Sequence, residues 1–120
     1  MELFELRMVD FQNEDERGNL VQLAHDDMKQ VNILESHKNA FRGGHFHKKC
    51  TESFYILKGS VKVNLSLGNE TTEAVFKAND FFRIKPFVVH SMYFEEDTIM
   101  IVMYDCAIEE VNGTKDIFNA

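Results

Sequence analysis

The segment His45-Phe46-His47-Lys48-Lys49-Cys50-Thr51-Glu52, which leads into an apolar run that ends at Gly59, decides how the rest of the chain is interpreted. In a β-strand, residues i and i+2 point to the same face, so His45 and His47 point in one direction. Glu52 joins them from the next strand if residues 48–51 form the turn between the two strands. Two neutral imidazoles and a carboxylate are a typical ligand set for a divalent metal. A third imidazole must come from elsewhere in the chain.

His90 supplies that imidazole. It lies in the expected strand 88–94, four residues after Pro86. A single histidine on an apolar strand is more often a structural residue than a ligand, but the joint spacing of all these residues rarely arises by chance. The sequence therefore predicts a metal site formed by His45, His47, Glu52 and His90. Zn, Fe, Mn, Ni and Cu all accept this ligand set, so the metal is not specified.

The rest of the chain is patterned for short β-strands. Residues 60–67 alternate almost without fault between apolar and polar residues, and Gly68-Asn69 is typical of a hairpin turn. Residues 98–104 are apolar on both faces and are expected to form a central strand. Further strands are expected at 9–11, 20–23, 30–35, 54–57, 73–76, 81–84 and 88–94, and no long helix is indicated. This pattern predicts an all-β fold, an antiparallel sandwich or jelly roll.

Composition excludes several classes of function. A chain of 120 residues predicts one domain, and a net charge of −7 without a basic run argues against nucleic acid and anionic membranes as main partners. No apolar run approaches the ~20 residues needed to span a bilayer. The acidic N-terminus lacks the pattern of a signal peptide, which favours a cytoplasmic location. Cys50 and Cys106 are too few for a disulfide scaffold and are expected to be free thiols.

Two longer patterns match the sequence motifs of the cupins. The first motif is a glycine, five residues, His-x-His, three or four residues, a glutamate, six residues and a glycine, and the run from Asn39 to Gly59 is similar to it. The second motif resembles residues 79–94, where Pro86 and His90 stand at the matching positions. The chain thus resembles the cupin superfamily. The resemblance implies a double-stranded β-helix, the jelly-roll cupin barrel, with His45, His47, Glu52 and His90 as metal ligands.

The resemblance also implies the organisation of the chain. Residues 1–120 form a single cupin domain, with N-terminal strands in 1–38, a barrel core that contains both motifs in 39–105, and a C-terminal tail in 106–120. Asn39 and Asn79 replace motif glycines, and asparagine tolerates a positive φ better than other residues with a side chain. Phe87 also replaces a glycine, so the turn that contains it is expected to differ.

A narrower resemblance is to the small cupins of nucleotide-sugar pathways, which include sugar 3,4-ketoisomerases, deoxysugar 3,5-epimerases and the cupin domains of capsule-synthesis enzymes. It rests on residues 15–20 (DERGNL), 29–31 (KQV) and 42–49 (RGGHFHKK). It implies that His45 is the base that acts on protons next to a ketone and that Arg42 contacts the substrate. Metal-free members of this group lack the glutamate that this chain keeps as Glu52. Whether His45 is a metal ligand or a free base therefore stays open.

Other residues complete the predicted site. Arg42, Lys48, Lys49, Arg83 and Lys85 form a basic group that suits a nucleotide diphosphate. Strict alternation places Arg42 on the face opposite His45 unless Gly43-Gly44 carries a bulge. Tyr104 is a candidate acid, with Tyr55 and Tyr93 as alternatives. His25 and His37 lie in expected turns and are interpreted as surface residues.

Three functions fit these features. The first is an isomerase or epimerase that acts on a nucleotide-linked keto sugar in surface-polysaccharide biosynthesis. The second is a metal-dependent dioxygenase with a small organic substrate, because three histidines and a glutamate also suit O₂ chemistry. The third is a non-catalytic cupin that binds a small ligand. Small cupins usually pair and this chain has apolar strand faces to spare, so a homodimer is expected.

Overall fold

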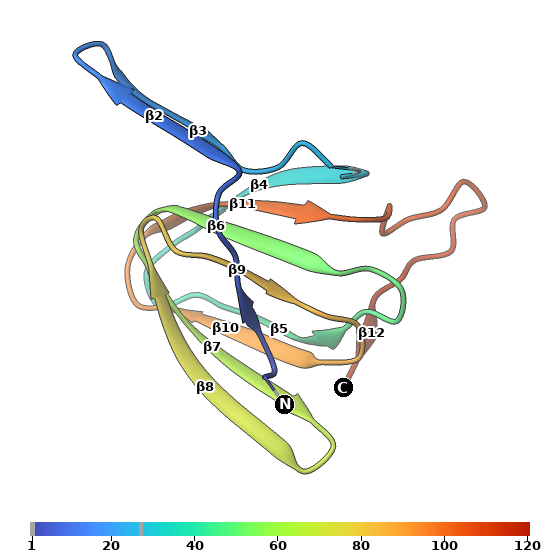
Figure 1. Cartoon of the computed structure of the whole chain (residues 1–120). Coiled ribbons are helices and arrows are strands. Elements are labelled where there is room, and N and C mark those ends of the chain that lie inside the picture. Colours follow the sequence, from blue (N-terminus) through green and yellow to red (C-terminus); the bar gives the residue numbers. More distant parts are fainter. Residues whose placement is uncertain (1, 27) are drawn as a thin grey trace.

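The computed structural model describes residues 2–26 and 28–120, and these residues form two five-stranded antiparallel sheets and a separate hairpin (Figure 1). One sheet has the order β1-β9-β6-β11-β4, with β1 at Glu5–Leu6, β9 at Phe81–Ile84, β6 at Glu52–Lys58, β11 at Thr98–Tyr104 and β4 at Gln30–Ser36. The other has the order β12-β5-β10-β7-β8, with β12 at Phe118–Asn119, β5 at Phe41–Phe46, β10 at Val89–Phe94, β7 at Ser60–Leu67 and β8 at Glu70–Lys77. The predicted jelly roll is confirmed. No helix in the described ranges is long and apolar enough to cross a membrane.

The apolar core lies between the two sheets. Phe82 of β9 is fully buried, and its ring stacks on Phe54 at 4.9 Å between centroids. Phe76 of β8 stacks on Phe82 at 3.7 Å, so aromatic rings from both sheets join the two layers. Burying such large apolar side chains is the main stabilising contribution in a domain of this size. Phe54 also lines a cavity, and it is therefore where the core meets the site described below.

Two features of the alternating pattern are confirmed. Strands β7 and β8 pair from Ser60↔Lys77 to Leu67↔Glu70 around Gly68-Asn69, as a hairpin requires. Strand β11 lies between β6 and β4, and Met103 on its face away from the main core packs in a second apolar cluster with Tyr55 and Phe81, so both faces of residues 98–104 are apolar.

The N-terminal expectation is wrong in detail. Strands were expected at 9–11 and 20–23, but the structure has a hairpin whose longer strands are β2 (Phe11–Asp15) and β3 (Gly18–Gln22). Its residues are mostly exposed on both faces, so the two strands lack the alternation of apolar and polar residues that normally marks a strand. The hairpin extends away from the two sheets (Figure 1).

The turns of the two motifs keep the glycine-like backbone that they were expected to need. Asn39 and Asn79 have φ of 72° and 76°, as predicted. Phe87 has φ of 72°, so the expectation that its turn would differ is wrong. The Phe87 N–H donates to the carbonyl of His47 at 2.6 Å, and its ring stacks on Phe46 at 6.4 Å between centroids. These contacts offset the cost of a left-handed conformation, which is about 1–2 kcal/mol for a residue with a side chain.

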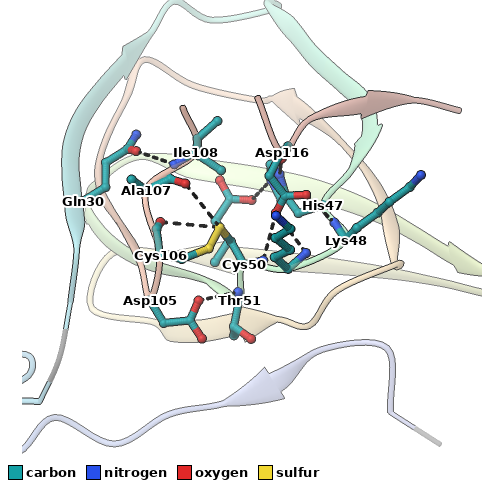
Figure 2. Close-up of a disulfide and its surroundings, with 12 residues drawn as sticks. Gln30, His47, Lys48, Cys50, Thr51, Asp105, Cys106, Ala107, Ile108 and Asp116 are labelled. Atoms are coloured by element: carbon teal, nitrogen blue, oxygen red, sulfur yellow. Dashed lines mark hydrogen bonds and ion pairs between the residues drawn. A yellow bond between two sulfur atoms is a disulfide. The ribbon is translucent and has the colours of Figure 1, made fainter. Parts of the chain in front are cut away.

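The expectation of free thiols is also wrong, because Cys50 and Cys106 form a disulfide (Figure 2). Strands β6 and β11 pair so that Glu52 faces Tyr104. Cys50 lies two residues before Glu52, and Cys106 lies two residues after Tyr104. The two cysteines therefore come together, with their Cα atoms 5.4 Å apart. Strand register of this kind is not visible in the spacing of two cysteines. The bond joins the turn at 48–51 to the segment that follows β11.

The glycine that ends the first motif supports a prediction about stability. Gly59 joins β6 to β7 with φ of 98°, and a Cβ there would overlap backbone atoms of Asp97 and Thr98. Gly59→Ala should lower the free energy of unfolding by more than about 3 kcal/mol, from backbone strain and overpacking together. Gly68 is the matched control, because it has φ of 61° and open space around it, and Gly68→Ala should cost only about 1 kcal/mol. Equal losses in urea denaturation would contradict this interpretation of Gly59.

The disulfide supports a second prediction. Its cysteines are 56 residues apart, so the chain-entropy estimate gives a stabilisation of about 4 kcal/mol. Dithiothreitol should therefore lower the urea midpoint of the wild-type protein. A Cys50→Ala/Cys106→Ala double variant should unfold at the lower midpoint with or without the reductant. A wild-type midpoint that does not respond to complete reduction would show that the bond stabilises nothing.

Candidate active site

A cavity of about 480 Å³ opens between the two sheets. Its polar wall brings together residues that are far apart in the sequence: His45 from β5, His90 from β10, Glu52 from β6 and Tyr104 from β11, with His47 just after β5. Its apolar wall includes Phe54, Met92 and Val102. A mostly apolar cavity of this size with a few convergent polar groups is typical of a site for a small molecule.

The three predicted histidines converge. His45 and His90 are cross-strand neighbours on β5 and β10, and their ring centroids are 4.8 Å apart. The His47 centroid lies 5.5 Å from that of His45 and 5.7 Å from that of His90. One ring nitrogen from each of the three lies within 4.8 Å of the others.

Glu52 is the buried carboxylate of the site, with only 5% of its surface exposed. Its Oε1 is 3.1 Å from Nε2 of His47 and 3.1 Å from Nε2 of His90. Burial alone would raise the pKa of Glu52, but the neighbouring His47 and His90 outweigh it and lower the pKa to about 2. The carboxylate is therefore ionised at neutral pH.

His47 is held between two acceptors. Its Nδ1 lies 2.6 Å from the carbonyl oxygen of Asp116, so Nδ1 carries a proton and donates it. Its Nε2 faces the Glu52 carboxylate, which also only accepts. Burial lowers the pKa of His47, but the hydrogen bonds to Glu52 and Asp116 raise it above the ordinary value. A positive charge is thus required between Nε2 and Glu52, and either a proton or a metal cation satisfies this requirement.

His90 completes the fit to a metal. Its Nδ1 is 3.1 Å from the carbonyl oxygen of Val88, which makes Nδ1 the donor and leaves a lone pair on Nε2. That Nε2 is buried and, among the described residues, has no partner with the geometry of a hydrogen bond, although Glu52 is close. Metal-binding histidines commonly donate their second N–H to a carbonyl in this way. The donors of His47, His90 and Glu52 therefore fit a divalent transition metal.

His45 differs from the other two histidines. It is partly buried, and within the described ranges its ring makes no hydrogen bond. Burial lowers its pKa, so the ring is neutral at pH 7 and has a free lone pair. It can thus act as a fourth ligand or as a base, and the geometry is compatible with both roles.

A bulge in β5 resolves the orientation of Arg42. Strand β10 pairs His90 with His45 and Ser91 with Gly43, so Gly44 is the extra residue. Arg42 consequently lines the same cavity as His45. Its Nε donates to the hydroxyl of Ser36 at 2.8 Å.

Tyr104 lies in the cavity wall, as expected of the candidate acid. Burial and the negative charge of Glu52 raise the pKa of Tyr104, so its hydroxyl stays protonated and can donate. Tyr55 and Tyr93, the alternatives, do not line the cavity, and they donate instead to the side chains of Asn79 and Asn39.

Three of the predicted substrate contacts lie away from the cavity wall. Arg83 and Lys85 both pair with Glu5, at 3.0 and 2.9 Å. In β9 the neighbours of Arg83 are buried in the core, so alternation turns Arg83 to the outer face of the sheet. The Lys48 ammonium lies 4.1 Å from the ring centroid of Phe118 rather than in the cavity. The expected surface positions are confirmed, since His25 is exposed beside Asp10 and His37 is exposed.

Asp116 is the residue of the site that the sequence did not reveal. It lies in the C-terminal segment, which contributes Ile108 and Ile117 to the cavity wall, but Asp116 itself does not line the cavity. Figure 2 shows Asp116 beside His47 and the turn that follows it. No motif surrounds Asp116, and only the pairing of β12 with β5 brings it to the site.

The comparisons with known proteins agree with this fold. QdtA from Thermoanaerobacterium thermosaccharolyticum, a 3,4-ketoisomerase solved as a mutant in complex with TDP-4-keto-6-deoxyglucose, is 23% identical with a TM-score of 0.82, and the match covers 100% of this chain and 89% of that one. WlaRA from Campylobacter jejuni, a TDP-fucose-3,4-ketoisomerase, is 15% identical with a TM-score of 0.78 over 98% and 89% of the two chains. CapF from Staphylococcus aureus, a capsular polysaccharide assembling protein, is 20% identical with a TM-score of 0.68, and the match covers 91% of this chain and 32% of CapF.

No curated protein matches the sequence. A family model described as the polysaccharide biosynthesis C-terminal domain matches residues 13–112. Because this match spans most of the chain, the chain belongs to the polysaccharide biosynthesis C-terminal domain family.

Proposed function

We propose that this protein is a cytoplasmic isomerase that moves the keto group of a nucleotide-linked sugar in surface-polysaccharide biosynthesis. The observation that carries the proposal is His45, a neutral imidazole without a hydrogen bond that lines the cavity beside a buried carboxylate and Tyr104. A neutral histidine is well suited to take a proton from a carbon next to a ketone at neutral pH. The family match and the ketoisomerases of the same fold, one of them bound to a TDP-keto sugar, support this choice of substrate.

The proposed reaction converts a 4-keto sugar into a 3-keto sugar. His45 removes the proton from C3, the electron pair of that C–H bond forms a C3–C4 double bond, and the ketone oxygen takes a proton from solvent water. The resulting enediol gives the proton of its C3 hydroxyl back to water, the C3 carbonyl forms, and the imidazolium of His45 returns its proton to C4. Tyr104 keeps its hydroxyl proton at all working pH values and is suited to donate a hydrogen bond to the ketone oxygen.

A divalent metal fits this scheme through His47, His90 and Glu52. When bound there, it would polarise the ketone and lower the pKa of the neighbouring C–H group. Arg42 is the cavity cation that we assign to the substrate diphosphate, because guanidinium groups bind phosphate oxygens in pairs. Its hydrogen bond to Ser36 and its contact with the carbonyl of Glu35 keep it oriented.

The reaction can be tested by NMR in D₂O with TDP-4-keto-6-deoxyglucose. Wild-type protein should incorporate deuterium and produce a 3-keto product, and His45→Gln should be about 10²–10⁴-fold slower because the base is lost. His37→Gln, which changes an exposed histidine, is the matched control and should leave the rate unchanged. Absence of exchange and product with several such sugars would contradict the proposal. Consumption of O₂ by the iron-loaded protein would favour the dioxygenase alternative.

The role of His45 can be separated from metal binding by metal analysis of purified variants. If His45 is the base, His45→Gln should bind as much metal as the wild-type protein, whereas Glu52→Gln should lose most of its metal because a charged ligand is removed. Loss of metal from both variants would instead make His45 a ligand and require another base.

We also propose that the protein is a homodimer. Strand β4 is at the edge of its sheet, and two apolar residues of its outward face, Val31 and Ile33, are 59% and 72% exposed. The protruding β2–β3 hairpin also exposes apolar side chains, Phe11 and Leu20. Unpaired strand edges and apolar patches of this kind are typically covered by another chain.

Sedimentation velocity tests the dimer. The wild-type protein should sediment at twice the chain mass of 14.0 kDa, and Ile33→Glu should shift it to a monomer because a charge cannot be buried in the interface. Val75→Glu changes an equally apolar residue on β8, 54% exposed in the other sheet, and should leave the dimer intact. A monomeric wild-type protein would contradict the proposal.

A further inference from the structure

The C-terminal segment returns to the site after leaving it. Beyond β11 the chain turns away and then crosses back to β5, where it ends (Figure 1). Phe118 pairs with Phe46, Asn119 pairs with His45, and the Ala120 N–H donates to the carbonyl of Gly44 at 2.9 Å. Residues 118–120 therefore lie along β5, the strand that carries His45.

The carboxylate of Asp116 is anchored in the turn between His47 and Glu52. Its Oδ1 accepts the N–H of Lys48 at 2.8 Å, and its Oδ2 accepts the N–H groups of Lys49 at 3.0 Å and Cys50 at 2.9 Å. Asp116 is only 8% exposed. Burial alone would raise its pKa, but the three N–H groups lower it, so the carboxylate is charged. One side chain thus fixes three successive peptide groups of the turn.

The backbone of the same residue holds the imidazole. The Asp116 carbonyl oxygen accepts the proton of His47 Nδ1 at 2.6 Å. That bond leaves Nε2 as the nitrogen that faces Glu52. The side chain and the backbone of Asp116 act together. The carboxylate binds the turn that follows His47, and this keeps the Asp116 carbonyl oxygen within reach of the His47 ring (Figure 2).

We propose that Asp116 is a positioning residue that acts through His47. It fixes which ring nitrogen of His47 carries the proton and the direction in which Nε2 points, and thereby keeps Nε2 aligned with Glu52. Only the expected effect of Asp116 on turnover rests on the proposed function. The contacts of Asp116 with His47 and with the turn are made within the protein itself. Partners of this kind commonly change metal affinity or activity by about 10–100-fold when they are removed.

Asp105 offers a matched control for a purely structural role. Its carboxylate accepts the N–H of Thr51 at 2.8 Å, so it also caps the turn and lies in the same returning segment. It makes no contact with His47 among the described residues. A variant of Asp105 therefore loosens the turn without removing the carbonyl contact to the imidazole.

The first test is NMR on the metal-free protein, in which the imidazole protons and nitrogens of His47 are observed directly. Wild-type protein and Asp105→Asn should both show a slowly exchanging Nδ1 proton on His47. Asp116→Ala should lose it, and the amides of residues 48–50 should exchange with solvent roughly tenfold faster or more. Asp116→Asn keeps the shape and one acceptor oxygen, so it should fold even if the alanine variant does not, with an intermediate effect. An unchanged His47 signal in Asp116→Asn and Asp116→Ala would overturn the proposal.

The second test is steady-state turnover of the keto sugar. Asp116→Asn should lower kcat by about 10–100-fold with KM nearly unchanged, since Asp116 does not line the cavity. Asp105→Asn should stay within about twofold of the wild-type kcat. A wild-type protein without turnover would count against the proposed reaction but not against the NMR result. A normal kcat in a folded Asp116→Asn variant of an active enzyme would overturn the catalytic consequence of the positioning.

Discussion

The buried carboxylate of Glu52 is the constraint on which the rest of the site depends. An ion with so little exposure is tolerated only if positive or hydrogen-bonding groups surround it, and here Nε2 atoms of His47 and His90 lie 3.1 Å from one of its oxygens. His47 must then carry a proton or contact a cation on that side, because its other nitrogen already donates to Asp116. The need to neutralise one carboxylate is therefore met either by a proton on His47 or by the metal cation that we propose.

A chain of contacts connects this carboxylate to the end of the polypeptide. Glu52 faces His47, His47 donates to the carbonyl of Asp116, and the Asp116 side chain holds the turn that leads back to Glu52. The disulfide between Cys50 and Cys106 joins the same turn to the start of the returning segment. The disulfide and these hydrogen bonds therefore hold Glu52, His47 and Asp116 in place relative to one another. His45 is not part of this network, and its ring makes no hydrogen bond among the described residues.

The sequence was informative wherever a local rule applied. The i, i+2 rule placed His45 and His47 together, alternation identified the β7–β8 hairpin, and the preference of asparagine for positive φ identified the turns at Asn39 and Asn79. It failed where the answer depends on strand register or on distant pairing. The disulfide follows from Glu52 facing Tyr104, Arg83 faces outward because its neighbours fill the core, and Asp116 reaches the site only through β12. None of these relations leaves a short-range pattern.

The central claim is our proposal that the imidazoles of His47 and His90 and the carboxylate of Glu52 would bind a divalent metal. X-ray absorption spectroscopy of protein loaded with one equivalent of Zn²⁺ tests it most directly. The account predicts nitrogen and oxygen ligands at about 2.0–2.2 Å, with the multiple scattering that imidazole rings produce. A sulfur shell at about 2.3 Å would place the metal on the reduced thiolates of Cys50 and Cys106 instead, and that result, or a failure to retain Zn²⁺ at all, would contradict the account.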